Sequence, residues 1–187
     1  MSIVLYIIFL EINTKENNMS IQTILNNHGI NSIWHFTDRS NLKSILEYGL
    51  LSLGAIVNNK IEVSRFGATH SSHIQDVKKG LHKFVHLSFI KDHPMYHMTK
   101  LDGRIIDPIW IEIDLSVMNE ENTLFSNMLA NTSNADIFNA ENLEKKIDFD
   151  IILHEKDFYT RKEARKAEIM VLNEISIDQI KEVHNGN

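Results

Sequence analysis

The stretch Arg161-Lys-Glu-Ala-Arg165-Lys-Ala-Glu168-Ile-Met-Val171 is the most informative part of this sequence. Four cations lead directly to one carboxylate, Glu168, and the apolar run behind it predicts a strand. A strand edge would hold this carboxylate rigidly beside a basic segment that attracts polyanions. By itself, the segment favours a simpler interpretation, in which an exposed charged helix is followed by a core strand. A second segment shifts the balance toward a functional site.

The second segment, residues 33–52, reads IWHFTDRSNLKSILEYGLLS. Its pattern predicts a short strand followed by a helix that is capped at its start and ends at a glycine. Side chains alternate along a strand, so His35 and Thr37 point to the same side, where they can hold a ribose hydroxyl and an amide. Trp34 and Phe36 point to the other side and are expected in the core. The alternative for His35 is a core histidine bonded to a backbone carbonyl.

Together with Gly80–Phe89 and Pro94–Tyr96, these two segments resemble the DarT family of nucleic-acid ADP-ribosyltransferases. The order and spacing of the segments between Ile33 and Val171 carry the resemblance, because no single motif is specific. The resemblance implies a toxin that transfers ADP-ribose from NAD, used as a substrate, to a base of single-stranded DNA. It also implies an antitoxin encoded nearby. The alternatives are the same reaction on RNA or protein, a non-catalytic nucleotide-binding module, and an unrelated hydrolase.

The expected fold class is α+β, because short strands mix with helices without regular alternation. The resemblance implies an ADP-ribosyltransferase-like fold, in which two small antiparallel sheets form an NAD cleft flanked by helices. The absence of a Gly-x-Gly-x-x-Gly motif argues against a Rossmann phosphate loop. Residues 20–27 predict a helix, and residues 33–37, 84–89, 109–115 and 168–172 predict strands. We expect a short strand at 149–153 and surface helices with loops at 119–148.

Composition limits the class of protein. The chain has 187 residues, no cysteine and a net charge of −6, which fits one cytoplasmic domain and excludes a thiol nucleophile. We expect residues 19–187 to form this domain and residues 1–18 to be an N-terminal extension. The apolar run Ile3–Leu10 is too short to span a membrane, so no membrane partner is expected. The histidines in the middle of the chain lack the spacing of a zinc motif, so no metal is expected.

The resemblance assigns roles to particular residues. Cleavage of the bond between nicotinamide and ribose passes through an oxocarbenium-like transition state, which a nearby carboxylate stabilises. Glu168 is the expected catalytic carboxylate, and Arg65 is expected to assist catalysis and bind the NAD phosphates. A basic residue after Ser72-His73-Ile74 is the alternative to Arg65. The expected NAD-binding residues are His35, Thr37, Arg65 and Tyr96. The residues expected to bind nucleic acid are Lys78, Lys79, Lys83, Arg161, Lys162, Arg165 and Lys166.

Overall fold

The computed structural model describes residues 20–119 and 122–186. The α-helices are α2 (Ile21–Asn27), α3 (Leu42–Tyr48), α4 (Leu53–Asn59), α5 (His70–Lys79), α6 (Pro94–Leu101), α7 (Leu143–Lys146), α8 (Phe149–His154) and α9 (Phe158–Ala164). The strands are β1 (Ile33–Asp38), β2 (Leu50–Leu51), β3 (Phe84–Ser88), β4 (Pro108–Ile113), β5 (Leu124–Ser126), β6 (Ile137–Phe138), β7 (Glu168–Leu172), β8 (Glu174–Ile175) and β9 (Ile180–Asn185). Short 3₁₀ turns are η1 (Arg39–Asn41), η2 (Leu81–Lys83), η3 (Leu115–Asn119), η4 (Ala140–Asn142) and η5 (Ile177–Gln179).

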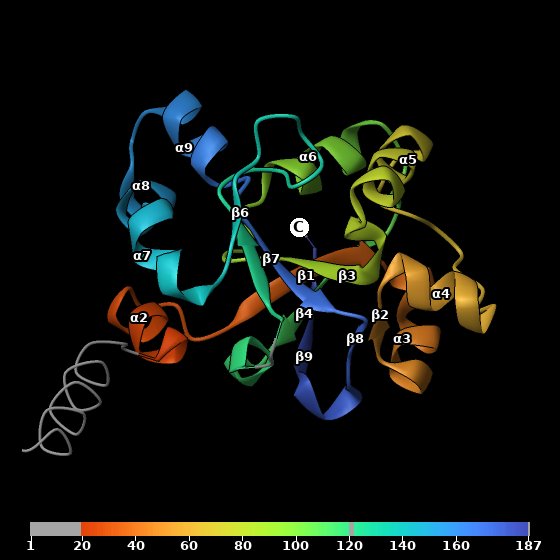
Figure 1. The fold of residues 1–187 in the computed structure, drawn as a ribbon. Helices are drawn as coiled ribbons and strands as arrows, with labels where there is room; N and C mark the ends of the chain where they lie inside the picture. The colour runs from red at the N-terminus through yellow and green to blue at the C-terminus, as the bar shows by residue number, and fades with distance from the viewer. Residues whose placement is uncertain (1–19, 120–121, 187) are drawn as a thin grey trace, which may run out of the picture.

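The main sheet has seven strands in the order β6-β5-β7-β3-β1-β4-β9, and β2 and β8 form a separate two-stranded sheet. Every strand pair in these sheets is antiparallel. Helices α3, α4 and α5 lie on one flank of the sheet, and α7, α8 and α9 lie on the opposite flank (Figure 1). The predicted α+β class is therefore confirmed.

The main sheet is held together at its middle by very little pairing. Strands β1 and β4 share six register pairs, from Ile33↔Ile113 to Asp38↔Pro108. Strands β1 and β3 share only the pair Trp34↔Ser88. Beyond that pair the two strands diverge, so the sheet divides into a β1-β4-β9 half and a β6-β5-β7-β3 half. This division accounts for the expected cleft between two small antiparallel sheets.

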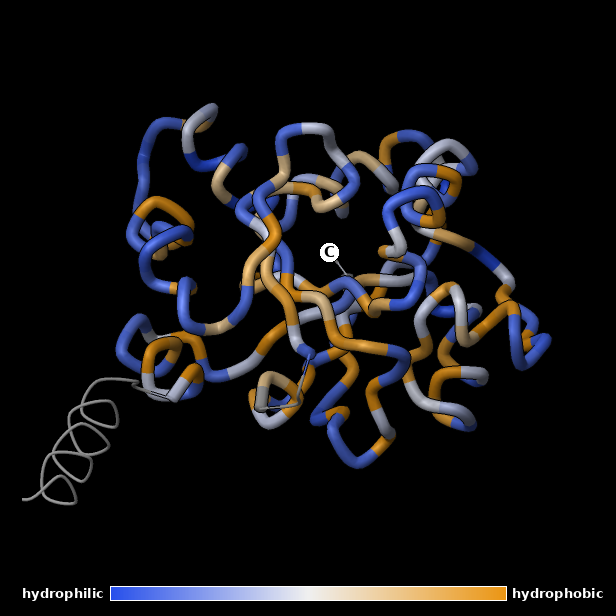
Figure 2. The backbone as a smooth tube through the Cα atoms, viewed as in Figure 1, coloured by the Kyte–Doolittle hydropathy of each residue, from blue (hydrophilic) through white to orange (hydrophobic). Residues whose placement is uncertain are grey.

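The apolar core follows the strands. Hydrophobic residues run along the central strands and mix with hydrophilic residues in the helices, whereas several outer loops are hydrophilic (Figure 2). Ile111 and Ile113 of β4, Ile169 and Val171 of β7, and Phe125 of β5 are all fully buried. Burial of such side chains is worth about 1.5–3 kcal/mol each, so these strands supply much of the stability. Within the described ranges, no helix is long and apolar enough to cross a membrane.

Most predicted elements are found, and the differences have physical reasons. The segment predicted as a strand at 149–153 is helix α8, so that prediction is wrong. Asp148 caps this helix by accepting a hydrogen bond from the Ile151 amide, and Phe149 and Ile152 are buried at helical spacing. Strands β5 and β6 lie within the region expected to hold surface helices and loops. The expectation for residues 1–18 lies outside the described residues.

Gly49 fixes the turn that leads helix α3 into β2. Its φ of +81° and ψ of −177° lie in a region that only glycine adopts readily. A Cβ placed there would lie 2.5 Å from the carbonyl oxygen of Ile175, the residue that pairs with Leu50 between β2 and β8. Glycine is therefore required both for its conformation and for the close approach of the two strands.

Gly49→Ala is expected to lower the free energy of unfolding by about 3 kcal/mol, because backbone strain adds to the clash with Ile175. Gly29→Ala is the matched control, since Gly29 also has a positive φ, +74°, but a Cβ placed there would have no atom beyond its chain neighbours within 4 Å. The control is expected to cost about 1 kcal/mol. Urea denaturation of both variants measures the difference, and equal losses would contradict this account.

Candidate active site

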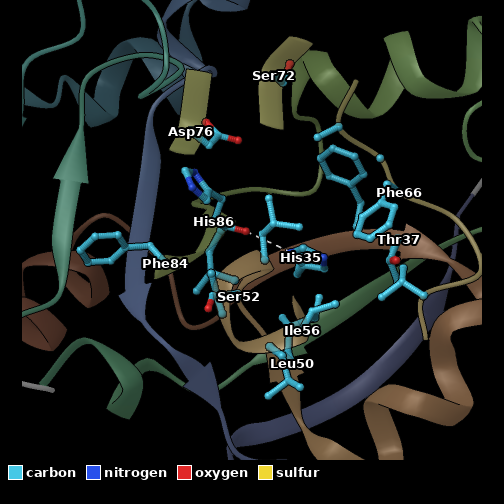
Figure 3. A pocket seen from close by; sticks show the side chains of 18 of the residues that line it. His35, Thr37, Leu50, Ser52, Ile56, Phe66, Ser72, Asp76, Phe84 and His86 are labelled. Atoms are coloured by element: carbon cyan, nitrogen blue, oxygen red, sulfur yellow. Dashed lines mark hydrogen bonds between the residues drawn. The ribbon is translucent and has the colours of Figure 1, made fainter. Parts of the chain in front are cut away.

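A pocket of about 310 Å³ opens where β1 and β3 diverge. Its walls come from both halves of the main sheet, from β2 and α4, and from α5 with the loop that precedes it. Four of the predicted site residues line it, namely His35, Thr37, Arg65 and Glu168. Side chains from β1, β3 and α5 converge on this space (Figure 3). The structure thus brings together residues that are 133 positions apart in the sequence, from His35 to Glu168.

His35 is held across the gap between the two half-sheets. Its Nδ1 lies 3.0 Å from the backbone oxygen of His86 on β3, so the ring donates its Nδ1 proton to that carbonyl (Figure 3). Burial lowers the pKa of His35 to about 4, against the opposing effect of this hydrogen bond. The ring is therefore neutral at pH 7, and Nε2 remains a hydrogen-bond acceptor. Both predicted alternatives apply, because His35 has a carbonyl partner and also lines the pocket.

Asn41 organises the side of the pocket that carries Thr37 and Arg65. The buried Asn41 amide donates to Thr37 Oγ1 at 3.1 Å and to the Arg65 carbonyl at 2.7 Å. Its Oδ1 accepts from the backbone amides of Ser64 and Arg65, at 3.0 and 3.2 Å. One side chain therefore fixes a loop without regular structure against β1. Arg65 itself is exposed at the pocket, which suits a residue that meets a charged ligand.

Glu168 stands at the first position of β7, as predicted, and its side chain is only 13% exposed. Its Oε2 accepts a hydrogen bond from the Ala130 amide at 2.9 Å and lies 3.2 Å from His86 Nδ1. Burial alone would raise the pKa of Glu168, but His86 and the Ala130 amide outweigh burial and lower it. Burial would lower the pKa of His86, and Glu168 reverses that effect and raises it. The site therefore contains an ionised carboxylate that is oriented before any substrate binds.

The partners of Glu168 were not predictable from the sequence. His86 alternates with apolar residues on β3, which indicates a cleft-facing position for some histidines of this region but does not identify a partner. The register pair Ser88↔Glu168 places β7 beside β3, and this long-range pairing brings His86 to the carboxylate. Ala130 lies in a loop whose composition shows no functional pattern. Only the tertiary structure joins these groups.

Tyr96 does not line the pocket, so its expected contact with NAD is corrected. Its side chain is 4% exposed and packs against Phe36 at 5.8 Å and Trp110 at 4.8 Å between ring centroids. Side chains alternate along β1, so Phe36 lies on the face opposite to His35. Phe36 pairs with Trp110 of β4 in the strand register. The predicted core position of Trp34 and Phe36 is only partly met, because both side chains are half-buried and also line the pocket. Tyr96 is therefore a core residue.

The residues predicted to bind nucleic acid divide into two groups. The first group bonds backbone carbonyl oxygens of the protein, and the second group consists of the remaining lysines. Arg161 donates to the Glu155 carbonyl at 3.0 Å, and Arg165 donates to the Ile152 carbonyl at 2.8 Å and pairs with Asp92. These two arginines therefore join α9 to the end of α8. Lys79 is also engaged, since its Nζ bonds the carbonyl oxygens of Ala130 and Thr132. Lys78 and Lys83 are exposed, Lys162 lies 6.0 Å from the Phe158 ring, and Lys166 pairs with Glu163.

One group of three side chains in the described ranges has the spacing of a metal site, namely Glu112, Glu182 and His184. These residues lie on β4 and β9, outside the pocket lining. Lys181 lies 3.3 Å from Glu112, and His184 Nε2 lies 2.7 Å from the same carboxylate. The Glu112 carboxylate therefore already has partners within the protein.

A family profile described as "ssDNA thymidine ADP-ribosyltransferase, DarT" matches residues 34–187. This chain belongs to the DarT family. The resemblance carried by residues 33–171 is thereby confirmed, and the family is described as ADP-ribosyltransferases that act on thymidine of single-stranded DNA. The family description adds thymidine as the modified nucleoside, which the sequence did not indicate. No curated protein matches the chain.

Solved structures of the DarT family share this fold. DarTG of Thermosipho africanus in complex with ADP-ribose has a TM-score of 0.70 and 19% identity, over 84% of this chain and 44% of that chain. DarT of Thermus sp. 2.9 in complex with ADP-ribosylated ssDNA has a TM-score of 0.64 and 21% identity, over 83% and 81%. The same DarT in complex with carba-NAD⁺ has a TM-score of 0.61 and 20% identity, over 82% and 81%. This chain thus spans less than half of the DarTG chain.

His93, a buried residue of the pocket, gives a pH-dependent prediction. Its Nδ1 accepts a hydrogen bond from the Met95 amide at 3.2 Å and caps helix α6, and burial lowers its pKa to about 4. The unfolded state has a pKa near 6.5 and gains a proton first as the pH falls. The contribution of neutral His93 to stability is therefore complete above pH 6.5 and decreases as the pH falls toward 4.

His93→Asn should reduce this loss, because asparagine also caps helices and does not titrate. Urea denaturation at several values between pH 6.5 and pH 4 is expected to show a smaller fall in unfolding free energy for the variant than for the wild type. His35, whose pKa is also about 4, remains in both proteins and accounts for the part of the fall that persists. Parallel stability curves would show that His93 does not contribute.

Proposed function

We propose that this chain transfers ADP-ribose from NAD to the thymine base of single-stranded DNA and acts as a toxin. The observation that carries the proposal is the ionised Glu168 carboxylate, held by Ala130 and His86 at the cleft between the half-sheets. Membership of the DarT family supports the donor and the acceptor. An unrelated hydrolase, with Glu168 and a histidine as acid and base, is disfavoured by membership of the DarT family.

Each pocket group has a role in this reaction. Glu168 faces the ribose next to nicotinamide and stabilises the positive charge that grows there as nicotinamide leaves. His35 accepts a hydrogen bond from a ribose hydroxyl through Nε2, and Thr37 supplies a hydroxyl beside it. Arg65 binds the NAD phosphates. Because Asn41 fixes Arg65 relative to Thr37, both ends of the donor are held in one geometry. No metal is required, since nicotinamide leaves as a neutral molecule.

The acceptor surface is proposed on helix α9, which immediately precedes Glu168 along the chain. Phe158 and Tyr159 are 58% and 76% exposed on this helix, beside Lys162. Exposed aromatic rings next to cations are typical of single-strand binding, in which bases stack while cations meet phosphates. Lys78 and Lys83 are proposed to extend the basic surface. The arginines of α9 are assigned to structure more than to DNA, because their guanidinium groups bond backbone carbonyls.

Partners and location complete the proposal. A chain that modifies DNA bases harms its own cell, so a neutralising antitoxin encoded nearby is proposed. NAD and single-stranded DNA occur together in the cytoplasm, where we place the reaction. RNA or protein as acceptor, and nucleotide binding without catalysis, are the alternatives. Incubation with labelled NAD and separate pools of single-stranded DNA, RNA and protein identifies the acceptor. Label in the RNA or protein pool alone, or in none, would overturn the DNA assignment.

Glu168→Gln is expected to lower the rate of transfer to DNA by about a hundredfold or more, because the variant cannot offer a preorganised negative charge to the transition state. Glutamine keeps the size of the side chain and its acceptor for the Ala130 amide, so the fold is preserved. Glu141→Gln, at an exposed position in η4, is the matched control and keeps normal activity. Near-normal transfer by the Glu168 variant, measured with labelled NAD under single-turnover conditions, would refute the catalytic assignment.

Two double variants, in α9 and the residues that follow it, distinguish the role of the lysines from that of the arginines. Lys162→Ala with Lys166→Ala is expected to weaken single-stranded DNA binding and to flatten its log–log salt dependence by roughly 0.7 for each phosphate that is no longer neutralised. Arg161→Ala with Arg165→Ala is expected mainly to lower the stability, since each substitution removes a hydrogen bond between α8 and α9. Fluorescence anisotropy against salt and urea denaturation measure the two effects. An unchanged salt slope for the lysine pair would exclude phosphate binding by these lysines.

A further inference from the structure

The pocket contains a second carboxylate, Asp76 of α5, to which the reaction above gives no role. Its Oδ1 is fully buried and has no hydrogen-bond partner among the described residues. A buried polar atom without a partner is unusual and costs roughly 1–3 kcal/mol, so such an atom requires an explanation. Figure 3 shows the Asp76 carboxylate beside the His86 imidazole, on the side of the pocket where α5 covers β3. Asp76 therefore lies close to the residue that orients Glu168.

One loop positions both carboxylates. In the segment between β5 and β6, the Ala130 amide bonds Glu168, and the side chain of the next residue, Asn131, lies close enough to Asp76 to lower its pKa. Lys79 of α5 holds the same loop through the carbonyl oxygens of Ala130 and Thr132. Adjacent residues of a tethered loop cannot be far apart, so Asp76 and Glu168 face one region of the pocket. Both residues line the pocket where the ribose and the attacking base would meet.

The proposed reaction needs a group that accepts a proton. Thymine N1 carries the deoxyribose, so N3 is the ring nitrogen that can be modified, and N3 carries a hydrogen. Glu168 is already committed to Ala130 and His86, and its pKa is lowered. His35 and His93 are weak bases with pKa values of about 4. Burial raises the pKa of Asp76, against the effect of His86, and a base with a pKa nearer to neutral accepts protons more effectively.

We propose that Asp76 is a further catalytic residue, the general base whose carboxylate takes the N3 proton of thymine. This inference rests on the proposed transfer to thymidine. As the bond between the ribose C1′ and the nicotinamide nitrogen breaks, its electron pair leaves with nicotinamide, which becomes neutral. The electron pair of the N3–H bond forms the new bond to C1′, and the proton passes to Asp76 and then to water.

The test compares two acceptors in DNA, thymidine and 5-fluoro-2′-deoxyuridine. Fluorine withdraws electrons and makes N3–H more acidic, so this acceptor depends less on a base. Asp76→Asn is expected to lower transfer to thymidine by about a hundredfold or more, and transfer to the fluorinated acceptor by much less. Affinity for carba-NAD⁺, measured by calorimetry, should stay unchanged, which also shows that the variant is folded. Asp178→Asn, at an exposed position in η5, is the matched control.

The outcomes separate the two proposals. A wild type that transfers ADP-ribose to neither acceptor overturns the proposed function and the role of Asp76 with it. If the wild type is active, an equal loss on both acceptors assigns Asp76 to structure, and a matching loss of carba-NAD⁺ affinity assigns it to donor binding. Unchanged transfer to thymidine also overturns the role. Only a loss that the acidic acceptor relieves supports a general base.

Discussion

The site depends on one constraint, the single register pair between Trp34 of β1 and Ser88 of β3. A sheet that pairs along its whole length leaves no space between neighbouring strands, because adjacent strands lie about 4.8 Å apart. Here the two strands separate after one pair, and side chains that a continuous sheet would place on opposite faces line the same space. His35 belongs to one half of the sheet, and His86 and Glu168 belong to the other. The hydrogen bond from His35 to the His86 carbonyl spans the gap.

The electrostatics of the site follow from its burial. A carboxylate removed from water tends to take up a proton, and Glu168 remains ionised because His86 and a backbone amide stabilise its charge. The desolvated surroundings of His35 have the opposite consequence, since they keep that ring neutral. Similar burial thus yields a charged carboxylate and an uncharged imidazole in one pocket. Glu168 is charged because of its partners, whereas His35 is neutral because of its burial.

Most strands and several pocket residues could be predicted from the sequence, whereas the contacts between residues distant in the sequence could not. Alternation at β4 and the apolar runs at β3 and β7 indicate strands directly, and His35, Thr37, Arg65 and Glu168 meet in the pocket as expected. The run at 149–153 contains β-branched residues that favour a strand, but the cap from Asp148 and burial at i and i+3 outweigh β propensity. The position of Tyr96 could not be predicted, because an aromatic ring serves a core and a ligand equally well.

The contacts of Arg165 tie the acceptor side of the site to one half of the sheet. This guanidinium joins the end of α8 to Asp92 in the segment that follows β3, while α9 continues almost directly into β7. Helix α9, which is proposed to meet DNA, and the carboxylate that begins β7 are therefore both joined to the β3-β7 half of the sheet. His35 and the clamp around Asn41 belong to the other half. The angle between the half-sheets at the Trp34–Ser88 junction therefore sets how the acceptor side is aligned with the donor side.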